Sequence, residues 1–171
     1  ANLVTNGTFD TDTTGWSSFS SATLSVENGG LKVECTGGDT VSAGSYNFTT
    51  VIGQRYTVTV EVVSRTGTTE LGISSTNIVG ASATILSTND DSASLSLGFN
   101  SRSFTATSTT TYIGLWTIGA DSNAVFDNIV VKQEDAPRDY SADIKGSGSN
   151  KTITAAGNAG VGYELGNYYD S

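Results

Sequence analysis

The stretch Thr111–Trp116 carries aromatic side chains at a spacing suited to binding a ligand. Successive side chains of a strand point to opposite faces, so Tyr112, Gly114 and Trp116 share one face. Two aromatic rings on either side of a glycine form a flat shelf, which suits the C–H face of a pyranose ring. We therefore expect Trp116, Tyr112 and Tyr46 to bind carbohydrate, with neighbouring amides and hydroxyls bonding to the sugar hydroxyl groups.

The sequence leaves an alternative open for these aromatic residues. Tyr112 and Trp116 could instead fill the core while Ile113 and Leu115 face a covering loop, because alternation does not say which face is buried. Another aromatic residue, Trp16, follows a glycine near the start of the chain. We expect Trp16 to pack over the edge of the fold.

Composition argues against catalysis. The chain has no histidine, which excludes Ser-His-Asp and Cys-His sites and any His-ligated metal. Its 17 acidic residues include pairs that could serve a glycosidase, but none occurs in a signature context. We therefore expect a protein that is not an enzyme.

The charge balance limits the partners. A net charge of −9 argues against nucleic acid, because binding phosphates requires clustered Lys and Arg. It also argues against an anionic membrane surface, and no apolar run approaches the ~20 residues of a membrane-spanning helix. No apolar segment of a signal peptide follows Ala1, so we expect synthesis in the cytoplasm without a visible signal peptide.

The elements that must position the aromatic shelf are strands. The 23 serines and 26 threonines favour β-structure and turns over helices. Tyr56, Val58, Val60 and Val62 alternate with polar residues, which predicts a strand with one wet face. Further strands are predicted at 24–27, 31–35, 40–48, 70–75, 83–87, 99–107, 111–118 and 124–132. About ten short strands without a convincing helix predict an all-β antiparallel sandwich.

Two local features refine this prediction. The loop Asn28-Gly29-Gly30 between two alternating runs predicts a β-hairpin, because these residues tolerate positive φ. The single cysteine, Cys35, shares a strand face with Leu31 and Val33, and we expect it to be a buried free thiol.

The composition changes after Gln133. The chain's only proline lies in the charged stretch 134–139, which predicts a linker. The rest, through Ser171, is rich in Gly, Asn and Ser and has too few apolar residues for a core of its own. We predict a sandwich over 1–133 and, over 134–171, a linker or assembly tail that either docks on the sandwich or on a partner, or is the edge of a further domain.

Motifs at both ends of the predicted sandwich resemble one family. Asn6-Gly7-Thr8-Phe9-Asp10 followed by Gly15-Trp16 looks like the opening of jelly-roll carbohydrate-binding modules of the family 4 and 9 kind. The run 126–131, Phe-Asp-Asn-Ile-Val-Val, is similar to their last strand. Such modules also occur in virion and tail proteins of bacteriophages, and the segment 139–151 resembles the entry into a lectin-like domain of such proteins.

The resemblance implies a noncatalytic jelly-roll module that recognises a cell-surface polysaccharide. It implies a setting in a phage virion or in a larger extracellular modular protein. The alternative is a structural virion protein, a capsid decoration or tail module that binds other virion proteins. An exposed aromatic shelf favours the first function, and a tail paired with other subunits favours the second.

The closing motif predicts an irregular strand. A flat strand cannot turn Phe126, Ile129 and Val131 to one face, so we expect a β-bulge at Asp127-Asn128.

The resemblance further implies a structural Ca²⁺ ion near this bulge. Its ligands would be the carboxylates of Asp10 and Asp127, completed by backbone carbonyl groups around Glu27, Asn28 and Gly29. Such hard oxygen ligands suit calcium. The alternative is that Asp127 only caps the bulge and Asp10 only begins a turn.

Overall fold

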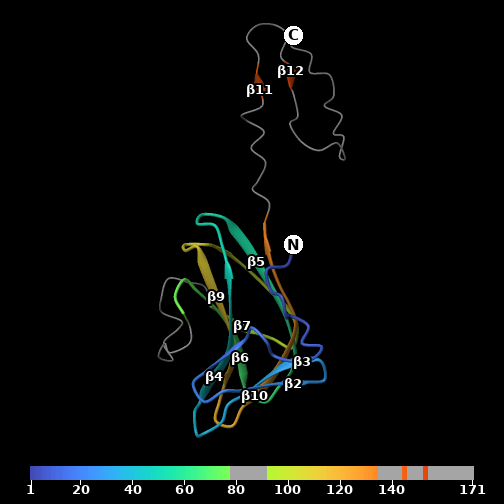
Figure 1. Ribbon diagram of the computed structural model, residues 1–171, viewed down its shortest axis with the longest axis vertical. Coiled ribbons are helices and arrows are strands. Elements are labelled where there is room, and N and C mark those ends of the chain that lie inside the picture. The colour runs from blue at the N-terminus through green and yellow to red at the C-terminus, as the bar shows by residue number, and fades with distance from the viewer. Residues whose placement is uncertain (78–91, 135–143, 146–151, 154–171) are drawn as a thin grey trace. The chain divides into compact units, whose positions relative to one another are not determined.

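The computed structural model describes residues 1–77, 92–134, 144–145 and 152–153. By its contacts the chain divides into two compact units, Ala1–Ala136 and Pro137–Ser171. The described strands of the first unit form two five-stranded antiparallel sheets (Figure 1). None of the described residues is helical. The prediction of an all-β antiparallel sandwich of about ten short strands is confirmed.

The described part of the first unit contains ten strands. They are β1 (Ser17–Phe19), β2 (Thr23–Glu27), β3 (Gly30–Glu34), β4 (Val41–Thr49), β5 (Arg55–Arg65), β6 (Thr68–Ser74), β7 (Ser92–Leu95), β8 (Gly98–Thr105), β9 (Thr110–Ile118) and β10 (Asn123–Gln133). Sheet A has the order β1-β4-β9-β6-β7, and sheet B has the order β2-β3-β10-β5-β8. Apart from β2–β3 and β6–β7, neighbouring strands are not consecutive in the chain, as in a jelly roll.

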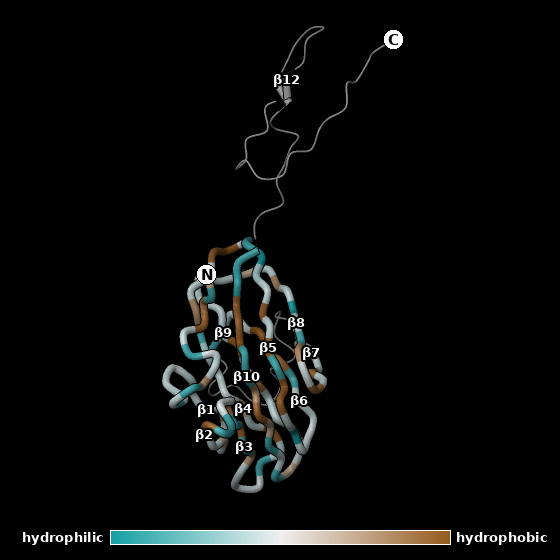
Figure 2. The backbone as a smooth tube through the Cα atoms, turned by 90° about the vertical axis from the view of Figure 1, so that its right-hand side faces the viewer, coloured by the Kyte–Doolittle hydropathy of each residue, from teal (hydrophilic) through white to brown (hydrophobic). Residues whose placement is uncertain are grey.

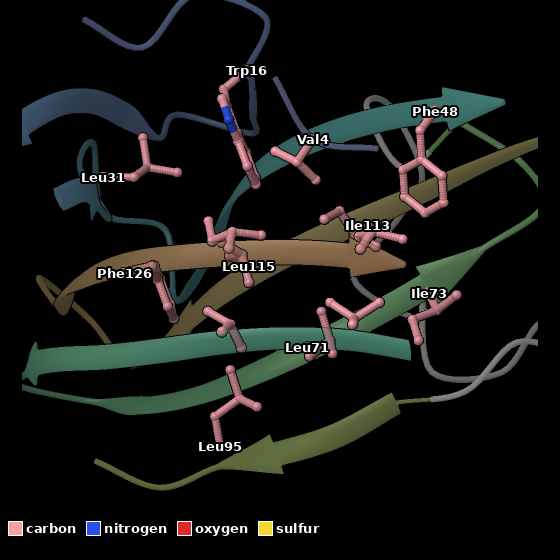
Figure 3. Close-up of a cluster of buried hydrophobic side chains, with 14 of the residues drawn as sticks. Val4, Trp16, Leu31, Phe48, Leu71, Ile73, Leu95, Ile113, Leu115 and Phe126 are labelled. Carbon is pink, nitrogen blue, oxygen red and sulfur yellow. The ribbon is translucent and has the colours of Figure 1, made fainter. Parts of the chain in front are cut away.

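The core lies between the inner faces of the two sheets. On β5, Tyr56, Val58, Val60 and Val62 are buried and the intervening residues face outward, as the alternation predicts. Figure 2 shows hydrophobic and hydrophilic residues following one another along β5 and β10. Figure 3 shows side chains from both sheets meeting, among them Leu71, Ile73, Ile113 and Leu115 of sheet A and Leu31 and Phe126 of sheet B. Each such buried side chain contributes roughly 1.5–3 kcal/mol.

Two local predictions are also confirmed. β2 and β3 form a hairpin whose turn residues Asn28 and Gly29 have φ of 52° and 80°, values that suit a two-residue turn matching the strand twist. Cys35 is a buried free thiol, and its Sγ donates to the carbonyl oxygen of Asp39 at 3.1 Å.

The strand prediction missed two of the described strands. β1 and β7 were not predicted, because three or four residues are too few to show a period of two. The strand predicted at 83–87 lies outside the described residues.

The second unit is described only in two short strands. β11 (Ile144–Lys145) and β12 (Thr152–Ile153) pair antiparallel, with Ile144 opposite Ile153. The assignment of 134–171 to a linker, a tail or the edge of a lectin-like domain stays a prediction. Among the described residues, no helix is long and apolar enough to cross a membrane.

Candidate functional site

β9 turns its aromatic side chains to the outer face of sheet A. Ile113 and Leu115 are fully buried between the sheets. Alternation therefore directs Tyr112, Gly114 and Trp116 to the opposite side. Of the two arrangements that the sequence left open, the structure has the one in which Ile113 and Leu115 fill the core.

Trp116 is nevertheless buried, which contradicts the prediction of an open aromatic shelf. Its side chain is 3 % exposed and forms a second apolar cluster with Phe19 and Ala43. The rings of Phe19 and Trp116 meet edge to face, with centroids 4.9 Å apart. The contact with Phe19 comes from the unpredicted strand β1, which pairs with β4 and sets Phe19 beside Ala43, which in turn lies opposite Trp116. The buried Trp116 Nε1 has no hydrogen-bond partner in the described part of the chain.

A row of small residues crosses four strands of this outer face. Ser17 lies opposite Ser45, Ser45 opposite Gly114, and Gly114 opposite Gly72. We call these four the small-residue row. The next row on one side contains Phe19, Ala43, Trp116 and Glu70, and the next on the other side contains Asn47, Tyr112 and Ser74. The second flanking row is the wetter, because Tyr112 is only half-buried and Asn47 is exposed.

Tyr46, the third residue predicted to bind carbohydrate, does not share this face with Tyr112 and Trp116, and its role in sugar binding stays a prediction. It lies opposite Ile113 and therefore on the inner side of β4. Its ring centroid is 5.3 Å from that of Trp16, and its hydroxyl group lies 3.0 Å from that of Thr5. The residue opposite Tyr112 is Asn47, which the sequence analysis missed because the register of β4 and β9 is not visible in either strand alone.

Trp16 has the structural role that the sequence predicted. It is buried in the main core, and its Nε1 donates to the carbonyl oxygen of Asn6 at 3.0 Å. Its ring centroid lies 5.5 Å from that of Phe9. The opening motif thus folds onto its own tryptophan.

The bulge predicted at Asp127-Asn128 is present. The register of β10 against β5 shifts between Asp127 and Val130, and Asn128 has a φ of 50°. The Asn128 backbone N–H donates to Asp127 Oδ1 at 2.6 Å. Asp127 therefore caps the bulge, as the alternative to calcium binding predicted. Capping uses only some of the carboxylate lone pairs, so the others remain able to bind a metal ion.

The other residues predicted to bind calcium have partners of their own. Asp10 Oδ2 accepts from the Thr8 hydroxyl group at 2.9 Å. The Glu27 carboxylate pairs with Lys32 at 3.1 Å, which raises the pKa of that lysine. Gly29 occupies the hairpin turn. In the described part of the chain, no three His, Cys, Asp or Glu side chains gather to hold a metal. Two carboxylates with backbone carbonyl groups remain a donor set suited to Ca²⁺, and calcium stays a prediction.

The outer face of sheet B carries a polar network that the sequence did not reveal. Glu61 lies opposite Asp127 in the register of β5 and β10. The side-chain amide of Asn128 donates to Glu61 Oε2 at 2.8 Å and to Asp127 Oδ2 at 3.2 Å. One amide thus holds two carboxylates next to each other.

A second network on this face fixes the end of β10. The Glu134 carboxylate accepts from the hydroxyl groups of Thr57 and Ser103 and pairs with Arg55 at 2.8 Å. These hydroxyl groups, with a smaller effect of Arg55, hold the pKa of Glu134 below its usual value. The Glu134 backbone N–H also donates to the Arg55 carbonyl oxygen.

Several solved structures share this fold. The enzymatically active domain of tailspike protein 4 from bacteriophage CBA120 has a TM-score of 0.60 at 11% identity, over 78% of this chain and 21% of that one. The CBM22-1–GH10 modules of Clostridium thermocellum xylanase 10B, complexed with xylohexaose, have a TM-score of 0.54 at 17% identity. That match covers 79% of this chain and 29% of the xylanase chain. TmCBM61, in complex with β-1,4-galactotriose, has a TM-score of 0.50 at 11% identity. That match covers 78% of this chain and 99% of the TmCBM61 chain.

At these identities the likeness establishes the fold. The sandwich has the jelly-roll fold of carbohydrate-binding modules, as the two terminal motifs implied. The chain spans only 21% of the tailspike domain and 29% of the xylanase chain. No protein-family model matches the sequence, and no curated protein matches it.

Proposed function

We propose that the sandwich is a noncatalytic carbohydrate-binding module that recognises a polysaccharide through the outer face of sheet A. The observation that carries the proposal is the pairing of Tyr112 with Asn47 beside the small-residue row. A half-buried tyrosine ring offers an apolar edge to a pyranose, and an exposed amide offers both donors and an acceptor to its hydroxyl groups. The jelly-roll fold shared with sugar-binding modules supports the proposal.

The same face supports binding without hydrolysis. Glycoside hydrolysis uses two carboxyl groups on either side of the scissile bond. Glu70 is the only acidic residue in the small-residue row and the two rows beside it. A single carboxylate can accept hydrogen bonds from a sugar but does not form the pair that the reaction requires.

The proposed setting is a bacteriophage particle or an extracellular modular protein, with the polysaccharide on a cell surface. The fold likeness to a phage tailspike domain supports this setting. In the alternative function, a structural virion module, the sandwich would bind protein subunits and no sugar.

Titration with xylohexaose and β-1,4-galactotriose, followed by the amide resonances of the full chain, tests the proposal. We expect a dissociation constant of roughly 10–1000 μM, because few contacts form per ring. Asn47→Ala and Tyr112→Ala should each weaken binding about tenfold or more. Asn47 is exposed, so its variant should melt like the wild type.

Tyr46→Phe is the matched control, since Tyr46 lies on the same strand pair but on the inner face. It should bind sugar normally. Normal binding by both Asn47→Ala and Tyr112→Ala would refute a site on this face. Failure of the wild type to bind any sugar, together with specific association with virion subunits, would favour the structural alternative.

A further inference from the structure

The largest exposed aromatic side chain in the described part of the chain lies on sheet B. Phe99 is 73 % exposed and lies on β8, the last strand of sheet B in the order of the described strands. Leu97, in the turn before it, is 61 % exposed, and Val63, near the end of β5, is also exposed. A ring left in water beside other apolar side chains is typical of a binding surface.

Phe99 stands in a row with two carboxylates. It lies opposite Glu61, and Glu61 lies opposite Asp127, across three adjacent strands. All three side chains are on the outer face, because Val60 and Val62 point into the core. Directly opposite side chains are about 5 Å apart, so a group resting on the Phe99 ring lies within reach of Glu61.

The carboxylates of this row are held in place before any ligand arrives. Asn128 donates to Glu61 Oε2 and to Asp127 Oδ2 through one amide group. A carboxylate offers about four acceptor positions, and the amide uses one on Glu61. The remaining positions can accept hydrogen bonds from hydroxyl groups at little cost in side-chain entropy.

We propose that the outer face of sheet B is a second sugar-binding surface, specific for neutral polysaccharides. Phe99 stacks against the C–H face of a pyranose ring, and Glu61 and Asp127 accept hydrogen bonds from its hydroxyl groups. Thr59 and Ser101, opposite each other in the next row, supply further hydroxyl groups along the same two strands. Uronic acids are excluded, because their carboxylates would meet those of Glu61 and Asp127.

A second copy of this chain fits the surface less well. Two copies joined through Phe99 would bring their Glu61–Asp127 pairs together. The row that contains these residues has no cation, and the chain carries a net charge of −9. Like charges brought together at an interface disfavour association.

This inference shares the class of ligand with the proposed function, but the two sites can be tested separately. Neutral xylohexaose and β-1,4-galactotriose are the probes, and oligogalacturonate is the charged control. The full chain is titrated with each, and amide shifts around Phe99 on β8 are followed separately from those around Tyr112 on β9.

Phe99→Leu keeps an apolar side chain but removes the ring, and it should weaken binding at sheet B about tenfold or more. Phe99→Trp should keep or improve binding, because a larger ring still stacks. Ile52→Ala is the matched control: Ile52 is 61 % exposed in the turn between β4 and β5, at the other end of β5 from Phe99, and its variant should bind sugar normally. The ring of Phe99 is exposed, so none of these variants should change the melting temperature appreciably.

Normal sugar binding by Phe99→Leu, or absence of neutral-sugar shifts around Phe99 in the wild type, would overturn the inference. Dissociation of a wild-type dimer by Phe99→Leu in sedimentation would overturn it too, in favour of self-association. The proposed function fails under a different result, namely normal binding by the Tyr112 and Asn47 variants.

Discussion

The outer faces of the two sheets differ in how far their aromatic side chains are exposed to solvent. On sheet A, Trp116 is packed against Phe19 and is 3 % exposed. On sheet B, Phe99 stands beside carboxylates and is 73 % exposed. Both residues lie on outward-pointing positions of regular strands. An outward position therefore does not by itself make an aromatic residue available to a ligand.

The difference follows from the neighbouring strands. Trp116 lies on the central strand β9, and the strands beyond it bring Ala43 and then Phe19 onto the same face. Phe99 lies on β8, which among the described strands of sheet B has a neighbour on only one side. An aromatic ring on an edge strand thus has fewer side chains to cover it.

The largest expected effect is a difference in stability between variants of the buried Trp116 and the exposed Phe99. Trp116→Ala should cost about 3–5 kcal/mol of unfolding free energy, as removal of a buried large ring typically does. Phe99→Ala should change it by less than about 0.5 kcal/mol, because an exposed side chain gives up few contacts. Urea denaturation of both variants measures the difference. Equal losses in the two variants would mean that the exposure of the two rings does not differ as described.

A calcium ion at Asp127 would stabilise sheet B near the bulge of β10 and would have no counterpart on sheet A. If Asp10 and Asp127 bind Ca²⁺, as the resemblance implies, calcium at 100 times its dissociation constant should add about 2.7 kcal/mol. EDTA should then lower the melting temperature of the wild type. Asp127→Asn should melt lower than the wild type and be indifferent to added calcium.

Asn128→Gly is a useful control, because it removes the bridging amide but keeps both proposed carboxylate ligands and allows the positive φ. It should retain the response to calcium. Identical melting of the wild type in EDTA and in millimolar calcium would leave Asp127 only as the cap of its bulge.

The parts of the fold that were predictable depend on local pattern. The alternation of β5, the turn residues of the β2–β3 hairpin and the spacing of Phe126 and Ile129 each specify a structure within about ten residues. These predictions are confirmed. The conspicuous motifs at the two ends of the sandwich led to the right fold because they lie in the elements that build its core.

The site was less predictable because it depends on how distant strands align. Choosing Asn47 over Tyr46 requires the register of β4 against β9. The contact of Trp116 with Phe19 requires β1, which shows no period of its own. In the sequence Phe99 looks like any other apolar strand residue, and its exposure follows from the position of β8 at the end of the order of described strands in sheet B. A one-residue slip in pairing moves every side chain to the other face, so the candidate site could not be specified from single strands.

The smallest effect is expected at the end of β10, where the outer face of sheet B binds Glu134 through hydroxyl groups. A carboxyl group whose pKa is lowered in the folded state stabilises that state above its unfolded pKa, about 4.5, and loses the contribution as the pH falls through the native value. Glu134→Gln should therefore melt slightly below the wild type at pH 7. This difference in melting temperature should shrink as the pH falls below about 4.5. Removing a negative charge from a chain of net charge −9 would by itself raise stability, so a loss points to the hydroxyl network. Arg55→Gln should keep most of the pH dependence, because the hydroxyl groups lower the pKa of Glu134 more than the arginine does. A gap between wild type and Glu134→Gln that persists unchanged at pH 3 would show that the carboxylate does not stabilise this end of the sheet.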